Sequence, residues 1–269
     1  MQKLLLPLLF LVSLKLSAQN IPYGNNKVTG NYYSVRGIKM YCEIYGKGEP
    51  LLMIHGNGGS VSDFKMNIGY FSKYYKVIIP DMRSQGKTKD ASDSLSYEMM
   101  ADDIAALMDT LKVGSAFIIG WSDGGNDGLL LAMNHPEKVR KLAITGANLW
   151  PGTSAIIESS VNDDKKRLAE LNVKPKKTAA EKNEYKLTYM MQVQPNITLK
   201  ELAAVLCPTL VIAGDHDLIK PEHTLLIYQN IPKAYLWIVP NSTHSTLQDQ
   251  KDAFNKTVHE FFSKPYHPF

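Results

Sequence analysis

The chain has few cysteines, no strong excess of either charge and no cofactor fingerprint. Its two cysteines cannot form a disulfide-rich scaffold or a zinc site made of cysteine alone. The 30 basic and 26 acidic residues leave a charge too mild and too mixed for a nucleic-acid binder. Neither a zinc-ligand spacing nor a dinucleotide-binding glycine motif occurs, so we expect no metal and no organic cofactor. The 269 residues, 44% of them hydrophobic, suffice for a large globular core.

One apolar run, at the N-terminus, resembles a targeting signal. A lysine at position 3 precedes apolar residues 4–14, and small residues follow at 17 and 18. This order is typical of a secretory signal peptide, which we predict over residues 1–18, with export to the periplasm or medium by a bacterial-type route. The run is shorter than the roughly 18 residues of a membrane-spanning helix, so an uncleaved anchor is the weaker alternative. In an oxidising compartment Cys42 and Cys207 would have to be considered as a pair, but nothing in the sequence brings them together, and two separate buried thiols are expected.

Short apolar runs alternate with helical patterns along the chain. Runs rich in β-forming residues occur at 41–45, 51–54, 77–79, 116–119, 142–144, 210–213 and 235–239. Most are apolar on both faces, as are parallel strands covered by helices on each side. Apolar residues 100, 104, 107 and 111 share one helical face, and 254, 258 and 261 share another. The alternation predicts an α/β fold with a doubly wound, mostly parallel sheet.

The alternation of strand and helix patterns stops between residues 149 and 206, where no strong strand pattern occurs and lysines are interspersed with acidic residues. We interpret this segment as a small helical cap inserted into a core formed by residues 19–148 and 207–269. Its lysines have acidic neighbours, which favours a solvated face over a nucleic-acid patch. Its large side chains are equally compatible with a cap core and with substrate contacts; they include Trp150, Tyr185, Tyr189 and Met190.

The strongest motif is Gly120-Trp121-Ser122-Asp123-Gly124, directly after one predicted strand and before a helical pattern. In this context G-x-S-x-G forms a strained turn that exposes the serine hydroxyl at the carboxyl end of the sheet. Serine needs a general base to become a nucleophile. His244, on the loop after the last predicted strand, lies at the same edge of the sheet, whereas His216 and His223 are weaker rivals.

The base needs a carboxylate to orient it, and the loop after residues 210–213 offers two. Asp217 lies further round the turn and can reach the histidine loop, whereas Asp215 should hydrogen-bond its own loop backbone. Ser122, Asp217 and His244 then occur in the order expected for this kind of fold. The oxyanion of the reaction needs donors, which we predict to be the backbone N–H groups of Asp123 and Asn57. His55, two residues before Asn57, is expected to be structural.

With these residues the chain resembles α/β-hydrolase fold serine hydrolases over essentially all of its mature length. The resemblance rests on the motifs above and on residues 81–86, where Ser84 replaces a usual glycine. The Gly120–Gly124 turn, called the elbow motif below, together with Gly146-Ala147-Asn148 is similar to the valacyclovir hydrolase (biphenyl-hydrolase-like) group. That group cleaves α-amino-acid esters, and the resemblance implies that Asp123 binds the substrate ammonium. An acid beside an oxyanion donor otherwise opposes the developing charge, which a cationic substrate would offset.

The sequence therefore predicts an exported serine hydrolase that cleaves a small-molecule ester, including α-amino-acid esters or amides, through an acyl-enzyme. An aminopeptidase or a carbon–carbon bond hydrolase is compatible with the same core. A hydrolase-fold protein kept only for ligand binding would be expected to lack part of the triad, which here is complete in sequence. No nucleic acid and no stable membrane insertion after signal cleavage are expected.

Overall fold

The computed structural model describes residues 21–267. Over this range the chain forms one eight-stranded sheet with the order β1-β2-β4-β3-β5-β6-β7-β8. β2 is antiparallel to both β1 and β4, and all other neighbouring strands are parallel. The strands are β1 (Gly30–Val35), β2 (Ile38–Tyr45), β3 (Glu49–Ile54), β4 (Tyr75–Pro80), β5 (Ala116–Trp121), β6 (Val139–Thr145), β7 (Thr209–Gly214) and β8 (Ala234–Val239). The doubly wound, mostly parallel sheet predicted from the sequence is confirmed.

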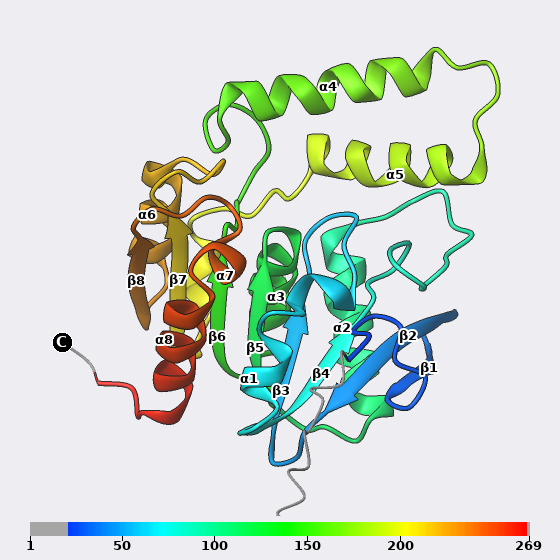
Figure 1. Cartoon of the computed structure of the whole chain (residues 1–269). Helices are drawn as coiled ribbons and strands as arrows, with labels where there is room; N and C mark the ends of the chain where they lie inside the picture. Colours follow the sequence, from blue (N-terminus) through cyan, green and yellow to red (C-terminus); the bar gives the residue numbers. More distant parts are fainter. Residues whose placement is uncertain (1–20, 268–269) are drawn as a thin grey trace, which may run out of the picture.

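Helices cover both faces of this sheet (Figure 1). One face packs against α2 (Tyr97–Thr110), α3 (Asp123–Asn134) and α6 (Pro221–Asn230). The other packs against α1 (Ile68–Phe71) and α8 (Lys251–Ser263), the latter preceded by the short α7 (Thr246–Asp249). Alternate residues of a central strand therefore enter different cores: Ile118 of β5 joins the first and Ile119 the second. This two-sided burial explains the uninterrupted apolar runs in the sequence.

Two antiparallel helices, α4 (Glu158–Asn172) and α5 (Ala179–Val193), connect β6 to β7 and lie beyond the carboxyl ends of the strands (Figure 1). Both fall within the segment that the sequence analysis assigned to a cap. Contacts with loops of the core hold α5 in place: the Asn183 side-chain amide donates to the Ser84 carbonyl oxygen at 2.6 Å, and the Lys186 ammonium to that of Ser92 at 2.7 Å. The helix pair therefore covers the edge of the sheet where the predicted site residues lie.

Further sequence-based expectations concern the N-terminal segment, the two cysteines, the first strand and membrane-spanning helices. The predicted signal peptide lies outside the described residues, and with it export stays a prediction. Cys42 and Cys207 are both free thiols, as expected, although Cys207 is only half-buried. β1 was not predicted. Within residues 21–267, no helix has the length and apolar character needed to cross a membrane.

Candidate active site

Ser122 lies in the sharp turn between β5 and α3. Its backbone angles, φ 57° and ψ −122°, fall in a region that costs a residue with a side chain about 1–3 kcal/mol. The turn is held because the Ser122 N–H donates to the carbonyl oxygen of Thr145 on β6 at 2.8 Å. A Cβ at Gly120 would overlap the Gly124 carbonyl oxygen, and one at Gly124 would overlap that of Ile54. Both glycines of the motif are therefore required for strand and helix to approach this closely.

The structure brings the three residues predicted as a triad into hydrogen-bonding distance. His244 Nε2 lies 2.8 Å from Ser122 Oγ, and His244 Nδ1 lies 2.6 Å from Asp217 Oδ1. The Asp217 side chain is fully buried, and its Oδ1 also accepts the N–H of Ile219 at 3.0 Å. A carboxylate at Nδ1 keeps the proton on that nitrogen, which leaves Nε2 free to accept the serine proton. The arrangement can therefore activate the hydroxyl.

The loop that carries His244 is fixed from several sides. The indole Nε1 of Trp121 donates to the His244 carbonyl oxygen at 2.8 Å. The Asp249 carboxylate accepts the Thr243 N–H at 2.8 Å and its hydroxyl at 2.6 Å. Gly146, with φ 66°, leaves room for the imidazole, since a Cβ there would lie 2.5 Å from His244 Cε1. The ring is thus held by packing as well as by its two hydrogen bonds.

Asp215, the weaker candidate for the orienting acid, has a different part in the site. Its carboxylate accepts the N–H of Asn241 at 2.9 Å and of Ser242 at 3.0 Å. These groups belong to the histidine loop, so the expectation that Asp215 bonds its own loop backbone is wrong. Hydrogen bonds from the His216 side chain and from these two amides lower the pKa of Asp215. Asp215 therefore supports the histidine loop without touching the imidazole.

The other histidines considered in the sequence lie away from the serine. The His216 side chain is 76% exposed and pairs with Asp215. His223 is buried against the Trp150 ring, and burial lowers its pKa to about 4, which keeps it neutral near pH 7. His55 is buried, with both ring nitrogens bonded to backbone groups, as expected for a structural residue. None of the three contacts Ser122.

The loop after β3 lies directly against the serine. A Cβ at Gly56 would lie 3.0 Å from Ser122 Cβ, so only glycine fits there without displacing the serine. In the described part of the chain, the backbone N–H groups of Asn57 and Asp123 have no acceptor. For Asp123 this follows from its place at the first position of α3, where helix amides lack an intrahelical partner. Two free donors beside the serine are what an oxyanion hole requires.

The Asp123 side chain is buried, with only 5% of the residue exposed. Its Oδ2 accepts a hydrogen bond from the side-chain amide of Asn57 at 2.8 Å, and the Tyr97 hydroxyl is also a partner. Burial raises the pKa of Asp123 above its ordinary value, and these two hydrogen bonds oppose the rise. One turn along α3, burial raises the pKa of Asp127 well above its ordinary value. A carboxyl solvated at a helix start is therefore excluded, and the side chain of Asn57 has a contact that the sequence did not reveal.

A cavity of about 280 Å³ opens beside the serine. Asn57, Ser122, Asp123 and His244 all line it, so the predicted site residues except the buried Asp217 share one chamber. Residues from the α4–α5 segment complete the wall; they include Ser160, Val161, Asp164, Met191 and Gln192. Among residues 21–267, three aspartates and no lysine or arginine line the cavity. In residues 21–267 no group of three or more histidines, cysteines or acids is arranged to hold a metal ion.

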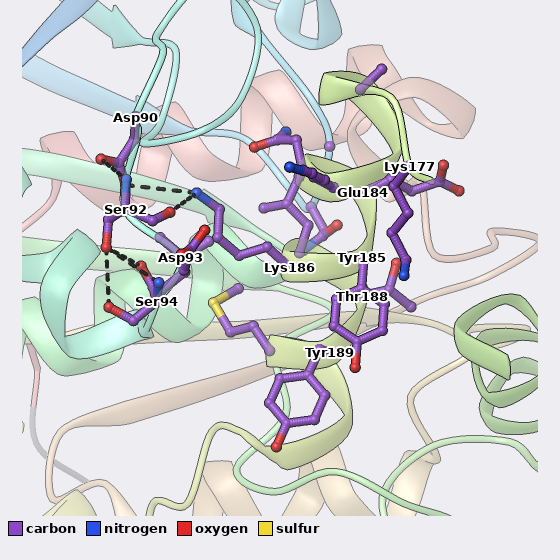
Figure 2. A pocket seen from close by; sticks show the side chains of 18 of the residues that line it. Asp90, Ser92, Asp93, Ser94, Lys177, Glu184, Tyr185, Lys186, Thr188 and Tyr189 are labelled. Atoms are coloured by element: carbon purple, nitrogen blue, oxygen red, sulfur yellow. Dashed lines mark hydrogen bonds and ion pairs between the residues drawn. The ribbon is translucent and has the colours of Figure 1, made fainter. Parts of the chain in front are cut away.

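A larger cavity of about 1210 Å³ lies between α5 and the loop that follows β4 (Figure 2). Asn57 and Gln194 line both cavities, so the two adjoin. Figure 2 shows Tyr185 and Tyr189 projecting from α5; their rings are stacked with centroids 6.0 Å apart. The second cavity also contains Met190, whereas Trp150 lines neither cavity. The larger space can hold a substituent that extends from the reacting bond.

Comparison with known proteins agrees with this geometry. The family described as "alpha/beta hydrolase fold" matches residues 49–170. "Serine hydrolase BPHL" of Mus musculus is 27% identical over 252 residues, which are 87% of this chain and 86% of that protein. "2-hydroxymuconate semialdehyde hydrolase" of a Pseudomonas species is 32% identical over 127 residues, 46% of this chain and 45% of that protein. The enol-lactonase structure from Burkholderia xenovorans has a TM-score of 0.73 at 22% identity and covers 87% of this chain and 100% of its own.

The chain therefore has the α/β-hydrolase fold and is an α/β-hydrolase enzyme. The resemblance inferred from the elbow motif is confirmed, because serine hydrolase BPHL is among its curated relatives. The match to BPHL extends over most of both chains.

Proposed function

We propose that the protein is a serine hydrolase that cleaves carboxylic esters through a covalent acyl-enzyme. The observation that carries this proposal is the pair of hydrogen bonds that joins Ser122 to His244 and His244 to Asp217. Ser122 Oγ attacks the carbonyl carbon while His244 Nε2 takes its proton. His244 then gives that proton to the leaving oxygen as the carbon–oxygen bond breaks. A water, activated by the same imidazole, hydrolyses the acyl-serine and restores the free hydroxyl.

The negative charge of the tetrahedral intermediate needs donors that are in place before the reaction. The free backbone N–H groups of Asn57 and Asp123 supply two, and removing one such donor from a serine hydrolase costs about 3 kcal/mol of transition-state stabilisation. The Asp217 carboxylate stabilises the imidazolium that forms at His244. Each of these groups is held by the contacts described above, so the site requires little rearrangement on binding.

A serine-directed fluorophosphonate probe tests this function. The protein should be labelled covalently at Ser122, because the probe reacts with a serine that a neighbouring base has activated. Intact-mass analysis should show one adduct on the wild-type protein and none on Ser122→Ala. Ser60, which lies in the neighbouring loop, offers the matched control, and Ser60→Ala should label normally. A protein that stays unlabelled would be a ligand-binding member of the fold rather than a hydrolase.

The charge of the cavity narrows the proposed substrate to esters or amides of α-amino acids. Asp123 is buried beside the serine, and a positive ammonium on the acyl group would offset the cost of keeping that carboxylate ionised. The same ammonium offsets the repulsion between Asp123 and the oxyanion. A carbon–carbon bond hydrolase acting on a carboxylate-bearing substrate, as the name of the Pseudomonas relative denotes, would meet repulsion from three aspartates. The cavity therefore favours a cationic acyl group.

Asp123→Asn should lower kcat/KM for an alanyl ester about 30-fold more than for the propionyl ester of the same alcohol, since a buried charge pair is lost. Asparagine keeps the backbone N–H and the hydrogen bond from Asn57, so the propionyl ester serves as the internal control. Because burial raises the pKa of Asp123, the wild-type preference for the alanyl ester should fall as the pH drops through that raised value. Equal losses on the two esters would contradict an ammonium site.

A further inference from the structure

Asp164 is a carboxylate of the active-site cavity that has no partner in the part of the chain that the structure describes. It lies on α4 one turn after Val161, and both residues face the cavity. The structure assigns Asp164 no hydrogen bond and no ion pair with any residue between 21 and 267. Burial raises its pKa above the ordinary value, with Asp163 adding to the effect. A half-buried carboxylate without a cation is an unfavourable arrangement unless a ligand supplies the charge.

The other two aspartates of the cavity each accept a hydrogen bond from the protein. Asp63 accepts the N–H of Ser60 at 2.9 Å and closes the capping box of a short helix. Asp123 accepts the side-chain amide of Asn57. Asp164 alone among them comes from the α4–α5 segment, whereas Ser122 and Asn57 lie on loops of the core. The charge of Asp164 acts on Asp123, because it contributes to raising the pKa of Asp123. The two carboxylates therefore repel each other, and one cation at Asp123 leaves Asp164 unpaired.

We propose that Asp164 binds a second positive charge on the acyl group, so that the preferred substrates are esters or amides of basic α-amino acids such as lysine or ornithine. This inference rests on the proposed function. Asp123 would take the α-ammonium beside the scissile carbonyl, and Asp164 would take the side-chain cation. At about 280 Å³ the cavity is at the small end of ligand pockets, which suits one aminoacyl group. The leaving group would extend into the adjoining larger cavity.

A simpler arrangement has both carboxylates share the single α-ammonium. The two arrangements differ in what the removal of Asp164 does. If the α-ammonium is shared, every aminoacyl ester suffers equally. If Asp164 binds the side-chain cation, only the basic substrates suffer. Lysine and norleucine provide the comparison, because norleucine keeps the four-carbon stem of lysine and lacks the ε-ammonium.

The experiment measures kcat/KM for the lysyl and norleucyl esters of one alcohol. Asp164→Asn should lower the value for the lysyl ester about tenfold and leave that for the norleucyl ester within about twofold, as expected for a charge pair that is neither exposed nor fully buried. Asp164→Glu keeps the charge and should retain most of the lysyl preference. Glu158→Gln is the matched control: Glu158 is an exposed acid of the same helix, does not line the cavity and does not act on the pKa of Asp164, so neither ester should be affected.

The possible failures are separable. If wild-type protein hydrolyses the norleucyl ester and Asp164→Asn leaves kcat/KM for both esters unchanged, the role of Asp164 is overturned while the proposed function stands. Equal losses on both esters would assign Asp164 to the α-ammonium and overturn a second-cation site. If the wild-type protein hydrolyses neither ester, the aminoacyl substrate class fails and the inference fails with it. Circular dichroism of each variant checks that the helices are intact.

Discussion

Ser122→Ala and His244→Ala should each lower kcat for a p-nitrophenyl ester by about 10⁶-fold, and the double variant should be no slower than either single one. The reason is that the two side chains act as one unit. Without the hydroxyl the imidazole has no proton to accept, and without the imidazole the hydroxyl is a weak nucleophile. The measurement is steady-state hydrolysis at high enzyme concentration, with the rate of the buffer subtracted.

A matched control uses a histidine outside the site. His216→Ala removes an imidazole that is mostly exposed and does not contact Ser122, so its kcat should stay within about twofold of wild type, as for an ordinary surface substitution. Losses that multiply in the Ser122→Ala/His244→Ala double variant would mean that the two residues act independently. That result would contradict the mechanism drawn from their hydrogen bond.

The fold could be predicted from the sequence because its central strands are buried on both faces. Such strands give unbroken apolar runs, and the helices between them give a 3.6-residue period, so alternation alone indicated the sheet. β1 escaped prediction for the same physical reason. It is an edge strand whose residues are mostly exposed or half-buried, and it is defined by pairing with β2 through the turn at Arg36 and Gly37. Its sequence, GNYYSV, has valine as its one aliphatic residue and therefore leaves no apolar run to detect.

The approach of Ser122, Asp217 and His244 could be predicted from where each lies along the chain. Ser122 has a local motif, and the carboxyl ends of parallel strands meet at one edge, which brings the loops after β7 and β8 to the loop after β5. The part of the cavity wall formed by Tyr97 and Asp164 could not be predicted. Tyr97 begins α2 and Asp164 lies on α4, and neither has a motif that indicates a site. Their approach to Asp123 depends on how whole helices pack, which no short sequence pattern encodes.

The positions that accept only glycine also divide into those that a local motif predicts and those that depend on long-range packing. Gly120 and Gly124 belong to a recognised motif, so their requirement was readable in advance. Gly146 was noted only as part of a resemblance. Its physical role became visible with the structure, because a Cβ there would collide with the His244 ring, which is over 90 residues away in the sequence. Long-range exclusion of this kind leaves no local signature.

Asp215 and Asp217 allow a sharp test, because they are two residues apart and differ in what they hold. Asp217 accepts the Nδ1–H of His244 and orients the ring. Asp215 accepts backbone N–H groups of the loop that carries the ring. The first contact acts on the reaction, and the second acts on the stability of the loop. Replacing each carboxylate by the isosteric amide should therefore affect different measurements.

Asp217→Asn should lower kcat by about 10⁴-fold with little change in KM. The reason is that an amide N–H facing Nδ1 favours the His244 tautomer that carries its proton on Nε2, and a protonated Nε2 cannot accept the serine proton. Asp215→Asn should keep kcat within about tenfold and instead reduce the free energy of unfolding by about 1–3 kcal/mol, since one backbone N–H loses its acceptor. Ester hydrolysis and urea unfolding of both variants provide the comparison. Comparable losses of kcat in the two variants would remove Asp217 as the orienting acid, whereas a loss confined to Asp217→Asn would mean that the carboxylate acts through the histidine.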